Sequence, residues 1–224
     1  MRKNNILKFI VMPFIFLFAF TLGQDANSSE KEELEAGDIA PSFVAPYHLK
    51  AGDKTVKFEF LKNWSEVEDK NLRKFVTQPD RHAVLLSFFA TWCQPCMKEL
   101  PILEEVYQEY KDERIKFFLV DITEATRNNE GEVYGMAYKD VPKAGPFLEK
   151  KGVTMPILND NRGTAMKKYK AETLPRLFVM DGYRKLTFLR RGFHEGEEEK
   201  FTNELSEEIE RLLAELPEAK KGKK

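Results

Sequence analysis

The chain has 224 residues, of which 42% are hydrophobic, and this is enough to bury one substantial core in a single domain with accessory segments. Its 36 basic and 37 acidic side chains leave a formal net charge of -1, which excludes the broad basic excess typical of proteins that bind nucleic acid. The two cysteines, Cys93 and Cys96, exclude a framework of several disulfides and leave one local pair.

The N-terminal residues predict an export signal. Arg2 and Lys3 precede an apolar run at 9–22, which is shorter than the roughly 20 residues of a membrane span, and a polar stretch follows. An uncleaved N-terminal membrane anchor at 6–22 is the alternative. In both cases we expect the rest of the chain in the periplasm or another extracytoplasmic, oxidising space, soluble or tethered. We divide the chain into a signal peptide or anchor at 1–23, a polar linker at 24–36, a domain at 37–215 and a Lys-rich tail at 216–224.

The start of the domain predicts a β-hairpin and a helix. Strand-like stretches at 43–49 and 55–61 are separated by a turn that contains Gly52. The spacing of apolar residues at 64–76 predicts a helix, and Pro79 would end it.

The middle of the chain predicts an α/β core. Residues 83–90 are almost wholly apolar, as expected of a central strand covered on both faces. After the Cys93–Cys96 turn, apolar residues recur at helical spacing up to Asp112, and 115–122 is a second buried strand. Strand, helix and strand form a right-handed crossover, so the two strands should be parallel.

The last hundred residues continue this pattern. The segment 123–155 contains asparagines and glycines that indicate a loop, and a helix is expected to start at Pro146. The remaining predictions are a short strand at 156–158, a helix at 163–170, antiparallel strands at 176–180 and 185–193, and a final helix that ends near Pro217.

The cysteine turn carries the chemistry. A cysteine just before a helix faces unpaired backbone N–H groups and the positive end of the helix dipole, which stabilise its thiolate, so Cys93 should be the nucleophile. Pro95 fits the first helical turn, and the three-residue spacing lets Cys96 close a disulfide as the resolving thiol. This exchange requires no cofactor.

A Cys-x-x-Cys pair can also serve other functions. A zinc site needs further ligands, and His48, His82 and His194 have no paired ligand spacing. A purely structural disulfide would restrain little of the unfolded chain across so short a loop. A copper chaperone that uses both cysteines and His194 is the runner-up, because soft thiolates favour Cu(I). A peroxidase is disfavoured because the surrounding motif it normally needs is missing.

The segment Ala90–Cys96, with Pro101 farther along the helix, resembles the active-site segment of thioredoxins. More narrowly, the chain resembles the exported TlpA/ResA group over most of 37–213. The shared features are Gly37-Asp38-Ile39-Ala40-Pro41-Ser42-Phe43, Trp92-Cys93-Gln94-Pro95-Cys96, Glu99 and Leu174-Pro175. The resemblance implies a thioredoxin-like fold with the N-terminal hairpin as an extension and an insertion at 123–155. It also implies that Pro175 is cis and faces the disulfide, where the backbone before it pairs with a substrate peptide.

Trp92, Pro95, Leu174, Pro175 and Arg176 are thereby assigned to binding the partner. Trp92 would shield the disulfide, although an aromatic beside a buried strand is commonly part of the core. Arg176 would stabilise the Cys93 thiolate or meet an acidic partner, and the alternative is an exposed strand residue.

One departure concerns the buried acid. Thioredoxin has an aspartate in the central strand where this chain has Ser87. Glu99, three residues after Cys96, resembles the acid that the TlpA/ResA group carries near its dithiol, and we assign it proton transfer. The alternative is a solvated acid in the first turns of a helix.

The expected partners are disulfides or thiols of exported proteins and a membrane electron donor. The resemblance favours reduction, as in the maturation of apocytochromes with free haem-binding cysteines. The oxidising compartment favours oxidation, and the Gln94-Pro95 dipeptide does not decide the direction.

Overall fold

The computed structural model describes residues 33–49, 54–67, 80–133 and 135–218. The predicted export signal therefore lies outside the described residues, as does the Gly52 turn. Among the residues that are described, no helix is both long enough and apolar enough to cross a membrane.

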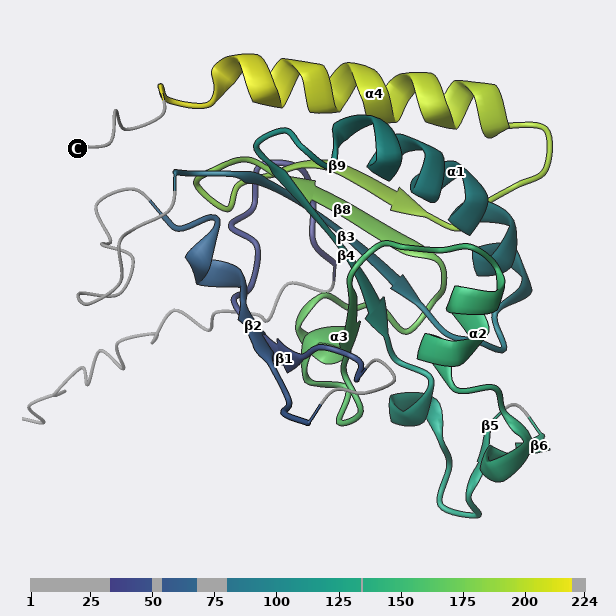
Figure 1. Cartoon of the computed structure of the whole chain (residues 1–224). Coiled ribbons are helices and arrows are strands. Elements are labelled where there is room, and N and C mark those ends of the chain that lie inside the picture. Colours follow the sequence, from purple (N-terminus) through teal and green to yellow (C-terminus); the bar gives the residue numbers. More distant parts are fainter. Residues whose placement is uncertain (1–32, 50–53, 68–79, 134, 219–224) are drawn as a thin grey trace, which may run out of the picture. The chain divides into compact units, whose positions relative to one another are not determined.

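A mixed five-stranded sheet with the order β7-β4-β3-β8-β9 forms the centre of the fold (Figure 1). The apolar runs of the sequence supply its middle strands, which are β3 (Ala83–Phe89) and β4 (Ile115–Asp121). Every residue of β3 is buried, because the strand has neighbours on both sides and is covered on both faces. The other strands are β7 (Ile157–Asn159), β8 (Arg176–Met180) and β9 (Leu186–Arg191).

The directions of the strands determine which residues lie together at each end of the sheet. β3 pairs in parallel with β4, which in turn pairs in parallel with β7, whereas β8 runs antiparallel to both β3 and β9. The predicted parallel pairing of β3 with β4 and the predicted antiparallel pair of β8 and β9 are thus confirmed. Because β8 is antiparallel to β3, the first residues of β8 lie where β3 ends and the cysteine turn begins.

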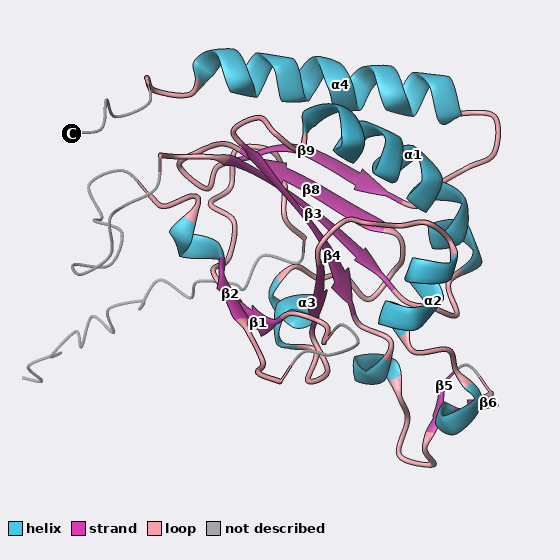
Figure 2. Ribbon diagram, in the orientation of Figure 1, coloured by secondary structure: helices cyan, strands magenta, loops and turns pink. Residues whose placement is uncertain are grey.

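Helices cover both faces of the sheet (Figure 2). The long helices α1 (Gln94–Tyr110) and α4 (Glu198–Glu215) lie together on one face, and α3 (Thr164–Lys168) lies on the other. α4 buries Phe201, Leu205, Ile209 and Leu212, the face that its 3.6-residue periodicity predicts. The expected α/β fold is therefore present.

The N-terminal hairpin is present in shortened form. β1 (Val44–Pro46) pairs antiparallel with β2 (Phe58–Phe60), and a single bridge from Tyr47 to Leu158 joins the hairpin to β7. A 3-10 helix, η1 (Leu61–Asn63), follows directly.

The helix predicted at 64–76 does not begin where it was expected. Residues 64–67 are not helical, and the remainder of that prediction lies outside the described residues. The reason is a set of long-range bonds. The Ser65 hydroxyl donates to the carbonyl of Asp181 at 2.7 Å, and the buried Glu66 carboxylate pairs with Arg184 at 3.0 Å. These contacts hold Ser65 and Glu66 in a non-helical path beside the β8–β9 turn.

The segment between β4 and β7 contains more structure than a loop. It comprises the 3-10 helices η2 (Glu124–Thr126) and η3 (Tyr138–Asp140), the two-residue strands β5 (Glu132–Val133) and β6 (Met136–Ala137), and the helix α2 (Ala144–Lys150). α2 begins two residues before the predicted start at Pro146, so the proline occupies its first turn, where no backbone N–H is needed.

Candidate active site

The cysteine turn caps α1 at the end of β3. Cys93 is the N-cap residue, and Cys93 and Cys96 form a disulfide with Cα atoms 5.3 Å apart. The backbone N–H of Cys96 donates to the Cys93 sulfur at 3.2 Å. Once the disulfide is reduced, this bond and the helix N-terminus favour a thiolate on Cys93. Both cysteines are buried, whereas Gln94 and Pro95 between them are exposed.

Glu99 lies one helical turn after Cys96 on the same side of α1. Its side chain is 1% exposed, so the alternative of a solvated acid is wrong. The Ser87 hydroxyl on β3 donates to its carboxyl oxygen at 3.3 Å. Burial raises the pKa of Glu99 to about 8, against the opposing effects of the Ser87 hydrogen bond and the Arg190 charge. In the disulfide form Glu99 is therefore protonated at neutral pH.

Residues that the sequence analysis did not single out anchor the cysteine turn. The backbone N–H of Thr91 donates to the Thr123 hydroxyl at 3.0 Å, and that hydroxyl donates to the carboxylate of Asp121 at 2.5 Å. The indole N–H of Trp92 donates to the Thr126 hydroxyl at 3.0 Å. Trp92 is partly buried and packs against the core, as the core alternative expected, and the shielding of the disulfide stays a prediction. The polar residues that follow the buried strand β4 were the available sequence signal for Thr123 and Thr126.

The Leu174–Pro175 peptide bond is cis, as the resemblance implied. β8 begins at the next residue, and Arg176 is opposite Phe88 of β3 and opposite Arg191 of β9. Arg176 is 5% exposed, so the alternative of an exposed strand residue is wrong; the residue is buried because β8 has a neighbouring strand on each side. The guanidinium of Arg176 is therefore a buried cation at the end of the sheet where the Cys93–Cys96 turn lies. We call this end the redox end of the sheet.

The histidines have separate partners. His48 contacts the carboxylate of Asp121 at 3.1 Å, His82 contacts the carbonyl of Asp80 at 2.6 Å, and His194 is exposed. Within the described ranges, no three His, Cys, Asp or Glu side chains are placed to hold a metal ion.

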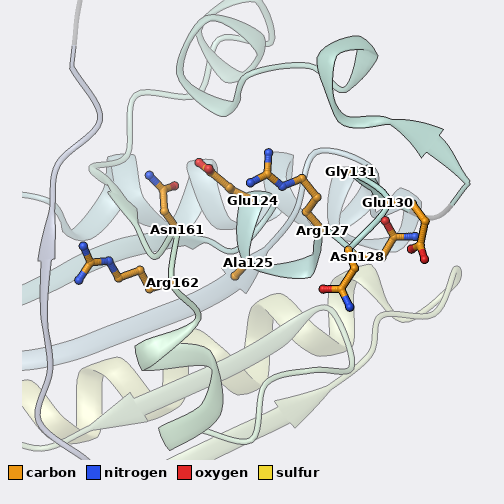
Figure 3. A pocket seen from close by; sticks show the side chains of 9 residues that line it. Glu124, Ala125, Arg127, Asn128, Glu130, Gly131, Asn161 and Arg162 are labelled. Carbon is orange, nitrogen blue, oxygen red and sulfur yellow. The ribbon is translucent and has the colours of Figure 1, made fainter.

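A polar pocket of about 610 Å³ is formed by the segments that follow β4 and β7 (Figure 3). Its lining includes Ala125 and Arg127, the chain neighbours of the Thr126 residue that binds the Trp92 indole. Glu124 and Arg127 lie side by side in the pocket, with Asn161 and Arg162 to one side. Its lining residues are Glu124, Ala125, Arg127, Asn128, Asn129, Glu130, Gly131, Asn161 and Arg162.

The model of the AhpC/TSA family matches residues 36–188, which span the cysteine turn, the cis proline and four strands of the central sheet in full. The chain belongs to the AhpC/TSA family.

Two relatives of this AhpC/TSA member are named as thiol-disulfide oxidoreductases. Thiol-disulfide oxidoreductase ResA of Bacillus cereus is 27% identical over 183 residues, which are 81% of this chain and 84% of the relative. Sporulation thiol-disulfide oxidoreductase A of Bacillus subtilis is 28% identical over 97 residues, which are 43% of this chain and 52% of the relative.

A solved structure supports the fold. The thioredoxin domain of a thiol-disulfide oxidoreductase from Bacteroides vulgatus has a TM-score of 0.50 and 16% identity, and the match covers 79% of this chain and 99% of that one. The chain is thus a thiol-disulfide oxidoreductase with a thioredoxin-like fold, and Cys93–Cys96 is its redox pair.

Proposed function

We propose that this oxidoreductase is a reductant of disulfides in exported proteins and that a membrane donor resupplies its electrons. Apocytochromes, whose haem-binding cysteines must be free, are the proposed substrate class. The direction and this class rest on the resemblance to the TlpA/ResA group. The proposal includes export of the domain at 37–215, either after cleavage of 1–23 or on an anchor at 6–22.

The observation that supports a proton-coupled cycle is the buried Glu99 carboxyl one helical turn from Cys96. A donor thiolate attacks the Cys93 sulfur, the Cys93–Cys96 bond breaks, and Cys96 leaves as a thiolate. Glu99, protonated in the disulfide form, supplies the proton that Cys96 requires. A second donor thiolate then releases Cys93 as a thiolate, and the donor is left as a disulfide.

The same residues act in reverse order on the substrate. The Cys93 thiolate attacks one sulfur of a substrate disulfide, and the first substrate thiolate leaves. The Cys96 thiol returns its proton to Glu99 and attacks Cys93, which releases the second substrate thiolate. Two electrons pass to the substrate, and the Cys93–Cys96 disulfide forms again.

In this proposal Trp92, Pro95, Leu174, Pro175 and Arg176 form the surface that receives the partner. Pro95 is exposed at the turn, and the Trp92 indole is held by its hydrogen bond to the Thr126 hydroxyl. Leu174 and Pro175 lead into β8 at the same end of the sheet.

The reduction potential of the Cys93–Cys96 pair tests the direction. The full-length chain is equilibrated against dithiothreitol or glutathione buffers, and free thiols are trapped and counted. A potential near about -270 mV supports a reductant, whereas one near about -120 mV marks an oxidant and overturns the proposed direction.

A further inference from the structure

Two arginines face each other at the redox end of the sheet. Arg176 begins β8, Arg191 ends β9, and the two residues are directly opposite in the strand register. Like charges that are opposite each other destabilise a sheet unless an anion lies between them. Here the anion is Glu33, whose carboxylate pairs with Arg191 at 2.5 Å and with Arg176 at 3.7 Å.

Arg176 is incompletely satisfied. Its side chain is 6% exposed, its Nε is buried without a hydrogen-bond partner, and its ion pair with Glu33 is long. The face of the Phe178 ring lies 5.4 Å from the guanidinium carbon. A buried guanidinium with an unused N–H is costly unless it binds an acceptor, and a carboxylate matches its planar geometry better than any neutral group.

The arginine pair is linked to the cis-proline loop. Arg191 donates to the Thr173 hydroxyl at 3.0 Å, and the backbone N–H of Gly192 donates to the Pro175 carbonyl at 2.9 Å. A carboxylate bound by the arginines therefore lies next to the residues that precede β8. Since the first residues of β8 lie at the end of β3, this carboxylate is on the same edge of the sheet as the cysteine turn.

We propose that Arg176 and Arg191 form a carboxylate-binding site for an acidic side chain of the partner protein, and that Glu33 occupies this site in the free chain. The inference rests on the proposed function, since it names the chemistry of the segment that flanks the exchanged disulfide. Glu33 is half exposed and can leave without disturbing the core, whereas Arg176 is fixed in β8. A partner segment with Asp or Glu near its cysteines would replace Glu33, and one without them would leave Glu33 in place.

Two peptides test this site. Both carry one disulfide between two cysteines, and they differ only in having aspartate or asparagine on either side of each cysteine. Binding is measured by calorimetry on the full-length chain with Cys93→Ser and Cys96→Ser, which cannot exchange thiols. The aspartate peptide should bind about threefold to tenfold more tightly than the asparagine peptide, and added salt should reduce the difference.

Variants of exposed residues in the same background identify the site. Arg191→Gln should abolish the preference for the aspartate peptide, and Glu33→Gln should increase it, because the internal competitor is removed. Arg211→Gln on α4 is the matched control and should change neither affinity. The carboxylate-binding site is refuted if Arg191→Gln keeps the preference for the aspartate peptide. It is also refuted if Glu33→Gln does not increase that preference.

Exchange is scored separately with the reduced wild-type chain. If neither peptide is reduced although the binding order is as expected, the proposed function fails and the carboxylate site stands. If both peptides are reduced but bind equally, the carboxylate site fails alone.

Discussion

Glu99→Gln should remove most of the pH dependence of stability between pH 5 and pH 8. In the folded chain burial raises the pKa of Glu99 from 4.5 to about 8. The folded form therefore holds a proton that the unfolded chain has released, so the stability present below pH 4.5 is lost as pH rises towards 8. Between these two pKa values the free energy of unfolding falls by about 1.4 kcal/mol per pH unit. The total decrease in the free energy of unfolding from pH 5 to pH 8 is roughly 3 to 4 kcal/mol.

The assay is guanidinium unfolding of the oxidised chain at four pH values, without reductant so that neither cysteine titrates. Wild type should lose stability along this range, while Glu99→Gln, which remains neutral, should lose much less. Glu105→Gln changes an exposed acid on the same helix and should behave as wild type does. Equal losses in wild type and Glu99→Gln would refute the buried, protonated carboxyl.

Four further substitutions test other parts of the molecule. Cys96→Ser should accumulate a mixed disulfide with a substrate on non-reducing gels, and Cys93→Ser should give none; the opposite pattern would exchange their roles. Thr123→Val removes the hydroxyl that anchors the cysteine turn and should lower the free energy of unfolding by about 1 to 3 kcal/mol in chemical denaturation. An unchanged free energy of unfolding would show that this hydroxyl does not anchor the turn. Glu66→Gln leaves Arg184 buried without its counter-ion and should cost about 3 to 5 kcal/mol in the same measurement, whereas a cost near zero would show that the pair contributes little.

The order of the elements could be predicted because its signals are local. An almost wholly apolar run identified β3, and apolar residues at helical spacing identified α4, without knowledge of any neighbour. The non-helical path of 64–67 could not be predicted in this way. It is fixed by Ser65 and Glu66, whose partners lie more than a hundred positions later in the chain.

The chemistry of the site was predictable in part. Cys93 lies just before the helix and Cys96 three residues later in its first turn, so their pairing follows from sequence. The environment of Glu99 was left open, although Cys96, Leu100 and the rest of the buried stripe of α1 follow the same spacing, which was the available signal for burial. The burial of Arg176 depends on β8 having neighbours on both sides, which only the strand order reveals.

Ser87 and Glu99 together explain how this site retains an internal acid without the strand aspartate of thioredoxin. The hydroxyl of Ser87 on β3 donates to the carboxyl of Glu99 on α1, so the strand now supplies a hydrogen bond and the helix supplies the acid. Because α1 also carries Cys96, one helix fixes the acid relative to the sulfur that it protonates in the proposed cycle. In the proposed cycle the partner approaches the exposed turn at Gln94 and Pro95, while the proton is exchanged between Cys96 and Glu99, two buried groups of one helix.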